Sequence, residues 1–202
     1  MSIDAQGEPH SLFEDFLNEH REPAPVSGAA IVPPPSEDEV AHQRILTNLR
    51  RLLTHQLRAE SCTVLPAGTA VRGHGNVGEF LYTPDLVVDA REWDGTSTVA
   101  REPLVVFEVA IPGSVRSDFI GKWQIHRAAP TVGVHVFVDR EGVVITVRRR
   151  KGDHWEEETL ADADDQIFLP TIHALVPLAD VYADAPYDAG DSSVGFGNVT
   201  LS

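Results

Sequence analysis

The sequence predicts an α/β domain, in which helices pack on a sheet that has buried strands. Three observations lead to this prediction. The segment PLVVFEVAIP (103–112) is an apolar run bounded by prolines, which is typical of a strand buried on both faces. Residues 37–59 carry apolar side chains at helical spacing, and residues 132–150 form a strong hairpin pattern. A chain of 202 residues with 42% hydrophobic content is long enough for one such domain.

The net charge of −15 is distributed unevenly along the chain. Residues 1–40 hold nine acidic residues and one basic residue, and residues 153–202 hold eleven acidic residues and no basic one. Residues 41–152 hold eleven acidic and fifteen basic residues. The central segment is therefore mildly basic, and the overall charge does not exclude a polyanionic partner such as nucleic acid. Acidic flanks often only keep a protein soluble, so they do not by themselves indicate a function.

The sequence favours a soluble cytoplasmic protein. Residues 1–20 carry five acidic residues and no apolar run, unlike a signal peptide, and no stretch approaches the roughly 18 apolar residues of a membrane span. Cys62 is the single cysteine, which excludes a disulfide within the chain and favours a reducing compartment. We expect no membrane partner.

The first elements are an acidic segment at 1–28 with a short docking helix, an edge strand at 29–32, and a long helix at 37–59. Ser36 and Glu39 form an S-x-x-E capping box at the start of the long helix. Its apolar stripe consists of Ile45, Leu49, Leu52, Leu53 and Leu57. The arginines at 44, 50, 51 and 58 lie largely away from that stripe, which suits either a solvated face or a phosphate-facing edge.

Residues 63–71 read as a strand bent at Pro66 and Gly68. The following GHGNVG (73–78) matches the G-x-G-x-x-G dinucleotide pattern, but that pattern must open a helix, and Pro84 follows too soon for one. We therefore predict a loop at 73–78. It could act as a substrate-facing flap that carries His74, an accessory candidate.

Two carboxylates are expected to meet at one edge of the sheet. Residues 84–90 and 103–111 form strands joined through an Asp94-Gly95 turn, and an antiparallel pairing would bring Asp85 close to Glu108. Because every neighbour of Glu108 is apolar, its charge would cost several kcal/mol without a cation or hydrogen-bond donors. The pair could hold a divalent metal.

A helix at 114–129 follows the strand that carries Glu108, and Asp118, Lys122 and His126 share one stripe on it at i, i+4 and i+8. Lys122 is thus a second candidate partner for Glu108, and Asp118 and His126 are accessory candidates. After the strands at 132–139 and 143–150, a last short helix or turn is expected within 171–183, and residues 183–202 are expected to form a disordered acidic tail.

The ordered motifs VPPPS with HQRI, PDLVV, LVVFEVAIPGS, D-x-x-x-K, VFVD and PLADVYA resemble the Uma-two type of putative restriction endonucleases, a branch of the PD-(D/E)XK nuclease superfamily. The resemblance covers residues 29–182. It implies a restriction-endonuclease-like core with a mixed sheet flanked by helices, and a magnesium-dependent site that hydrolyses phosphodiester bonds in nucleic acid, with DNA as the expected substrate and Mn²⁺ as a substitute metal.

The resemblance also implies the site residues. Asp85 matches the acid of the PD motif, Glu108 the acid of the third motif and Lys122 the helix lysine of this branch. Asp85, Glu108 and the backbone carbonyl of Val109 would hold the metal, and Lys122 would act on the attacking water or the phosphate. The superfamily's usual lysine two residues after the acid is Ala110 here, and a helix tyrosine common in the branch is His126.

Two other functions fit the same residues. A catalytically inactive nuclease-fold domain could bind nucleic acid or a protein partner without cutting. Alternatively, a domain that forms a homodimer could use Glu108 and Lys122 as a buried ion pair with no metal.

Overall fold

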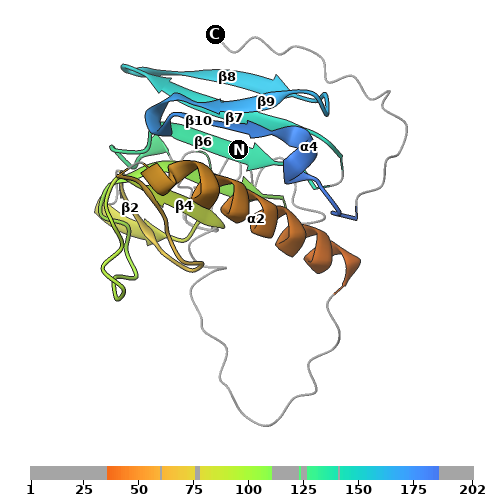
Figure 1. Cartoon of the computed structure of the whole chain (residues 1–202). Helices are drawn as coiled ribbons and strands as arrows, with labels where there is room; N and C mark the ends of the chain where they lie inside the picture. Colours follow the sequence, from red (N-terminus) through yellow and green to blue (C-terminus); the bar gives the residue numbers. More distant parts are fainter. Residues whose placement is uncertain are drawn as a thin grey trace, which may run out of the picture.

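The structure is a computed structural model and describes residues 36–59, 61–75, 78–110, 123, 127–140 and 142–186. It contains a six-stranded sheet, two two-stranded sheets and the helix α2 (Figure 1). In chain order the elements are α2 Glu37–Gln56, η1 Leu57–Ala59, β1 Thr63–Val64, β2 Val71–Gly75, β3 Gly78–Tyr82, β4 Leu86–Asp89, β5 Pro103–Val109, β6 Val134–Val138, β7 Ile145–Lys151, β8 His154–Leu160, β9 Gln166–Leu169, η2 Pro170–Ile172, β10 Ala174–Pro177 and α4 Leu178–Val181.

The main sheet has the strand order β1-β4-β5-β6-β7-β8, and only the β5–β6 pair is parallel. A parallel neighbour requires a crossover connection between the two strands, and residues 110–133 supply it. The predicted mixed α/β fold is thus confirmed. Because β5 and β6 are parallel, their carboxyl ends lie at the same edge of the sheet.

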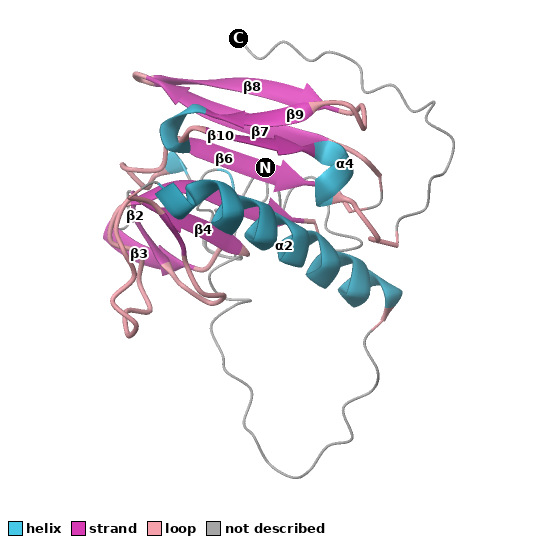
Figure 2. Ribbon diagram, in the orientation of Figure 1, coloured by secondary structure: helices cyan, strands magenta, loops and turns pink. Residues whose placement is uncertain are grey.

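One face of the main sheet is covered by α2, the β9–β10 hairpin and α4 (Figure 2). The capping box at the start of α2 forms as predicted, with Ser36 Oγ accepting from Glu39 N and Ser36 N donating to Glu39 Oε2. The helical stripe Ile45, Leu49 and Leu53 is fully buried in the larger core. This stripe fixes α2 across the sheet because apolar burial stabilises the fold by roughly 25 cal/mol per Å².

The opposite face of the sheet has its own apolar cluster, which includes Val71 of β2, Val87 of β4 and Val106 of β5, with Tyr82 of β3 packed against it. The β2–β3 hairpin therefore lies against this second face. The prediction of a loop at 73–78 is wrong for the ends of that segment, since Gly73–Gly75 and Gly78 belong to the hairpin strands.

Glycine is required at position 73 by packing. A Cβ at Gly73 would lie 2.5 Å from the Phe80 ring across the hairpin, so only glycine lets the ring sit there. Gly78 is the first residue of β3, so the glycine pattern leads into a strand and does not open a helix, as predicted.

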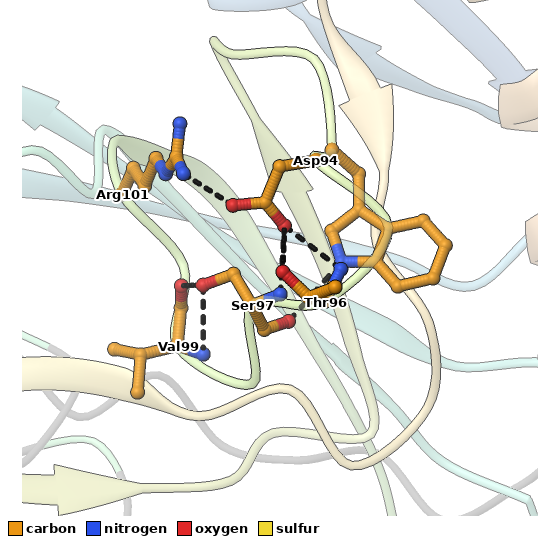
Figure 3. A network of polar contacts seen from close by, with 6 residues as sticks. Asp94, Thr96, Ser97, Val99 and Arg101 are labelled. Carbon is orange, nitrogen blue, oxygen red and sulfur yellow. Dashed lines mark hydrogen bonds and ion pairs between the residues drawn. The ribbon is translucent and has the colours of Figure 1, made fainter.

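The predicted turn between β4 and β5 is present (Figure 3). Asp94 Oδ1 accepts hydrogen bonds from Thr96 N and Ser97 N, Gly95 has a φ of 85°, and Arg101 pairs with Asp94 across the loop. Backbone donation lowers the pKa of the Asp94 carboxyl. The turn returns the chain so that β5 pairs with β4.

The edge strand of the main sheet and a separate two-stranded sheet were not predicted. The edge strand β8 pairs with β7, and its glutamates bind the basic run of β7, with Arg148 to Glu157 at 2.6 Å and Arg149 to Glu158 at 2.7 Å. The β9–β10 hairpin was likewise missed. The short closing helix α4, by contrast, lies within the predicted range.

Several predictions fall on residues outside the described part of the chain: the docking helix in 1–28, the edge strand 29–32 and most of the acidic tail 183–202. Of the predicted helix 114–129, the structure describes Trp123 and residues 127–129, and Trp123 and Arg127 are helical.

Candidate active site

Asp85 lies directly before β4, and Glu108 is the sixth residue of β5. The two strands are antiparallel with Leu86 opposite Phe107, so one further step in this register sets Asp85 opposite Glu108. Residues directly opposite each other have Cβ atoms about 4.5–5.5 Å apart and point to the same face. The backbone register thus sets the two acids that the sequence singles out at facing positions of neighbouring strands.

The Asp85 carboxylate is held in place by the backbone of β5. Its Oδ2 accepts a hydrogen bond of 2.8 Å from the N–H of Val109. In an extended strand the N–H and C=O of one residue point to the same side. The carbonyl of Val109 therefore faces the side on which Asp85 lies, which makes it available as a third oxygen next to the two carboxylates.

Glu108 is buried, with 4% of its surface exposed, whereas the side chain of Asp85 is 25% exposed. The pair thus consists of one carboxylate inside the sheet and one at its rim. An ion or phosphate that reaches Asp85 from solvent also lies beside Glu108.

Two further residues interact with the carboxylates and were not predicted as part of the site. His42 of α2 places Nε2 3.4 Å from Asp85 Oδ1, and its side chain is 20% exposed. Four residues earlier on the same helix, Asp38 forms an ion pair of 2.8 Å with the buried Arg140, which follows β6. The first turns of α2 are thereby fixed against the edge where β5 and β6 end.

Tyr82, the last residue of β3, is the second unpredicted neighbour. Burial, and after it the negative charge of Glu108, raises the pKa of the Tyr82 phenol above its ordinary value. The phenol therefore stays neutral at physiological pH and can donate a hydrogen bond. A neutral donor that feels the charge of Glu108 is compatible with a site for anionic oxygens.

Of the remaining predicted site residues, His74 lies in the described part of the chain. His74 lies on β2, is more than half exposed and contacts Glu79 at 3.0 Å. Asp118, Lys122 and His126 lie outside the described residues.

Within the described ranges, no three His, Cys, Asp or Glu side chains cluster closely enough to hold a metal without other ligands. Two carboxylates and one carbonyl remain as candidates, all of them oxygen donors. Mg²⁺ prefers oxygen ligands and keeps several of its waters, so few protein ligands suffice for it. The donor set fits a magnesium ion.

A family model described as "Uma2: Putative restriction endonuclease" matches residues 14–179 of the chain. No curated protein matches it. Among solved structures, a putative nuclease belonging to DUF820 from Anabaena variabilis ATCC 29413 is similar in fold, with a TM-score of 0.58 and 14% identity. The alignment covers 86% of this chain and 98% of that one. None of the described helices has the length and apolar character needed to span a membrane.

Proposed function

Because the chain belongs to the Uma2 family, described as putative restriction endonucleases, we propose that it is a metal-dependent endonuclease that hydrolyses phosphodiester bonds of DNA. The observation that carries this proposal is the position of Asp85 opposite Glu108, with Asp85 bonded to the Val109 N–H. Two converging carboxylates repel each other, and a divalent cation between them offsets that repulsion.

In the proposed site, Asp85, Glu108 and the carbonyl of Val109 hold Mg²⁺, with Mn²⁺ as a substitute. When bound, the metal supplies a water of lowered pKa and offsets charge on the phosphate. The Val109 N–H fixes one oxygen of Asp85 and leaves the other directed toward His42 and solvent. The buried position of Glu108 keeps its carboxylate orientation constant.

A cation is also needed to stabilise the negative charge that develops on the phosphate. The residue two positions after Glu108 is Ala110, whose methyl side chain carries no charge. Its N–H donates to Val138 O, directly after the end of β5. This position therefore supplies no cation. We assign the role to Lys122, which matches the helix lysine of the family. The Tyr82 phenol, which feels the charge of Glu108, is suited to donate to an anionic oxygen.

A plasmid-nicking assay tests the proposal. Supercoiled plasmid is incubated with the full chain in Mg²⁺, Mn²⁺ or EDTA, and Glu108→Gln protein, purified in the same way, controls for contaminating nucleases. We expect nicking that requires the metal and is lost in Glu108→Gln.

Nicking that persists in EDTA, or that is equal in the Glu108→Gln protein, would contradict the proposal. If neither metal supports nicking although the protein binds the plasmid, the protein is a catalytically inactive domain that binds nucleic acid.

A further inference from the structure

A row of arginines runs along the solvent side of α2 and into η1, the 3₁₀ turn that follows it. Arg44, Arg51 and Arg58 are all exposed and follow each other at intervals of seven residues. Seven residues of an α-helix fall about 20° short of two turns and rise about 10.5 Å, so Arg44 and Arg51 lie on one face of α2. Arg58 follows in η1, directly after α2 ends at Gln56. We refer to Arg44, Arg51 and Arg58 as the α2 arginine row.

The α2 arginine row has no carboxylate partners among the described residues. Six other described arginines form ion pairs with carboxylates: Arg72, Arg91, Arg101, Arg140, Arg148 and Arg149. Arg50 and Arg150 instead donate to backbone carbonyl oxygens. The row is therefore an exposed surface whose positive charge no described carboxylate neutralises.

The surroundings strengthen the positive potential. Residues 40–59 contain four arginines and two histidines but no acidic residue, in a chain of net charge −15. Arg50 lies beside the row and donates to Leu65 O. A hollow of about 540 Å³ on this side of the helix is lined by polar side chains that include Thr47, Thr54 and His55. Hydroxyl and guanidinium groups are the donors that bind phosphate oxygens.

We propose that the α2 arginine row binds the phosphate backbone of duplex DNA. One strand of a duplex carries a phosphate every 3.4 Å or so along the axis, so the rise between Arg44 and Arg51 matches about three phosphates. The choice of DNA over another polyanion rests on the proposed nuclease function. Because His42 faces the sheet and the row faces solvent, the row is a separate contact that raises affinity without entering the reaction.

The energetic consequence is a salt dependence. Each phosphate contact lowers the slope of log K against log salt by about 0.9, so loss of three contacts changes the slope by about 2.7. The contact is made to the backbone, and it therefore contributes equally for all DNA sequences.

The test compares two triple variants with the same change in net charge. One removes the row, Arg44→Gln with Arg51→Gln and Arg58→Gln. The other neutralises three arginines that already have carboxylate partners, Arg72→Gln with Arg91→Gln and Arg101→Gln. Binding of a labelled 24-base-pair duplex is measured by fluorescence anisotropy in EDTA, from about 50 to 200 mM salt. Thermal melting verifies that each variant is folded.

We expect the row variant to bind at least about tenfold more weakly at 50 mM salt, with a slope of log K against log salt that is less steep by about 2.7, and the control variant to keep most of the wild-type slope. An equal loss in both variants would overturn the inference, and so would wild-type binding in the row variant. A peptide of residues 1–28 is tested in parallel. If the row variant loses this peptide but keeps the duplex, an acidic polypeptide is the partner and the inference fails.

The nicking assay separates this inference from the proposed function. If the wild type binds the duplex through the row but never cuts it, the cleavage proposal fails and the row remains a binding surface. If the wild type cuts and the slope is unchanged in the row variant, the row fails and the cleavage proposal stands.

Discussion

Asp85→Asn tests the metal site with the least damage to the fold. The Asp85 carboxylate accepts from Val109 N, and the carboxamide oxygen of asparagine can accept the same hydrogen bond. Asp85→Ala would instead leave a buried N–H without an acceptor, at a cost of about 1–3 kcal/mol. The asparagine variant thus removes the charge and keeps the local geometry.

The magnitude follows from the separation of the two acids. Unit charges about 5 Å apart repel by roughly 3 kcal/mol at an effective dielectric constant near 20. Solvent at the quarter-exposed Asp85 reduces this repulsion to about 1–2 kcal/mol. Replacing a charged acceptor with a neutral one costs about 1 kcal/mol. In EDTA we therefore expect Asp85→Asn to melt at or slightly above the temperature of the wild type.

Magnesium should raise the melting temperature of the wild type above that of Asp85→Asn. At a concentration 100 times Kd, a ligand stabilises the native state by about 2.7 kcal/mol. For a chain of this size that raises Tm by about 5–11 °C. The wild type should show this rise in a thermal melt with Mg²⁺ or Mn²⁺, whereas Asp85→Asn should not.

Asp89→Asn is the matched control, because Asp89 lies at the other end of β4 and also accepts backbone N–H groups, from Arg91 and Glu102. The Asp89→Asn variant should have a lower Tm than the wild type in EDTA and should still show the rise in Tm that Mg²⁺ or Mn²⁺ produces. The same rise in Asp85→Asn as in the wild type would remove Asp85 from the metal site, and loss of the rise in both variants would indicate a non-specific effect.

Four further predictions concern the residues around the carboxylate pair and the acidic terminal segments. Lys122→Met should abolish nicking while Tm in Mg²⁺ stays close to that of the wild type; a collapse independent of metal, measured by thermal melting, would favour a structural ion pair with Glu108. His42→Gln should weaken Mn²⁺ binding in calorimetry, because the contact of 3.4 Å with Asp85 is lost, whereas His55→Gln on the exposed side of α2 should not. Deletion of residues 1–28 and 184–202 should tighten binding of duplex DNA at low salt by removing acidic charge, and unchanged binding would show that the tails do not screen the surface. Folding raises the pKa of the Tyr82 phenol from 10.0, so the neutral phenol stabilises the fold fully below pH 10, and this stabilisation is lost as the pH rises above that value. The urea midpoint of the wild type should therefore fall between about pH 9.5 and 11.5, and Tyr82→Phe should make that fall smaller.

The parts of the fold that could be predicted are those with local signals. The capping box and apolar stripe define α2 within three residues at its C-terminal end, and the apolar runs define β4 and β5. The strand β8 has no such signal, because HWEEETL contains three consecutive glutamates, which are poor strand formers. Its pairing depends on the arginines of β7, which lie nine residues away in the sequence.

The site was predictable to the extent that strand register determines it. The hairpin of β4 and β5 places Asp85 opposite Glu108, and turn chemistry at Asp94 and Gly95 fixes that pairing. His42 required a tertiary contact that periodicity does not reveal. One signal was available, since His42 continues the buried stripe of Ile45 and Leu49 toward the start of α2, where a polar residue needs a partner.

Helix α2 offers a physical answer to how a chain of net charge −15 could hold a polyanion. On its inner side, His42 contacts Asp85 and Asp38 pairs with Arg140, so the start of the helix is fixed to the edge that carries the carboxylates. On its outer side, the α2 arginine row has no carboxylate partners among the described residues, whereas six other described arginines are neutralised in ion pairs. Long-range repulsion from the acidic segments is screened within about 8–10 Å at physiological salt, and contacts at the row act at shorter range than this. Net charge therefore lowers the rate of encounter with DNA more than it weakens the bound state, and the effect on the association rate should diminish as salt increases.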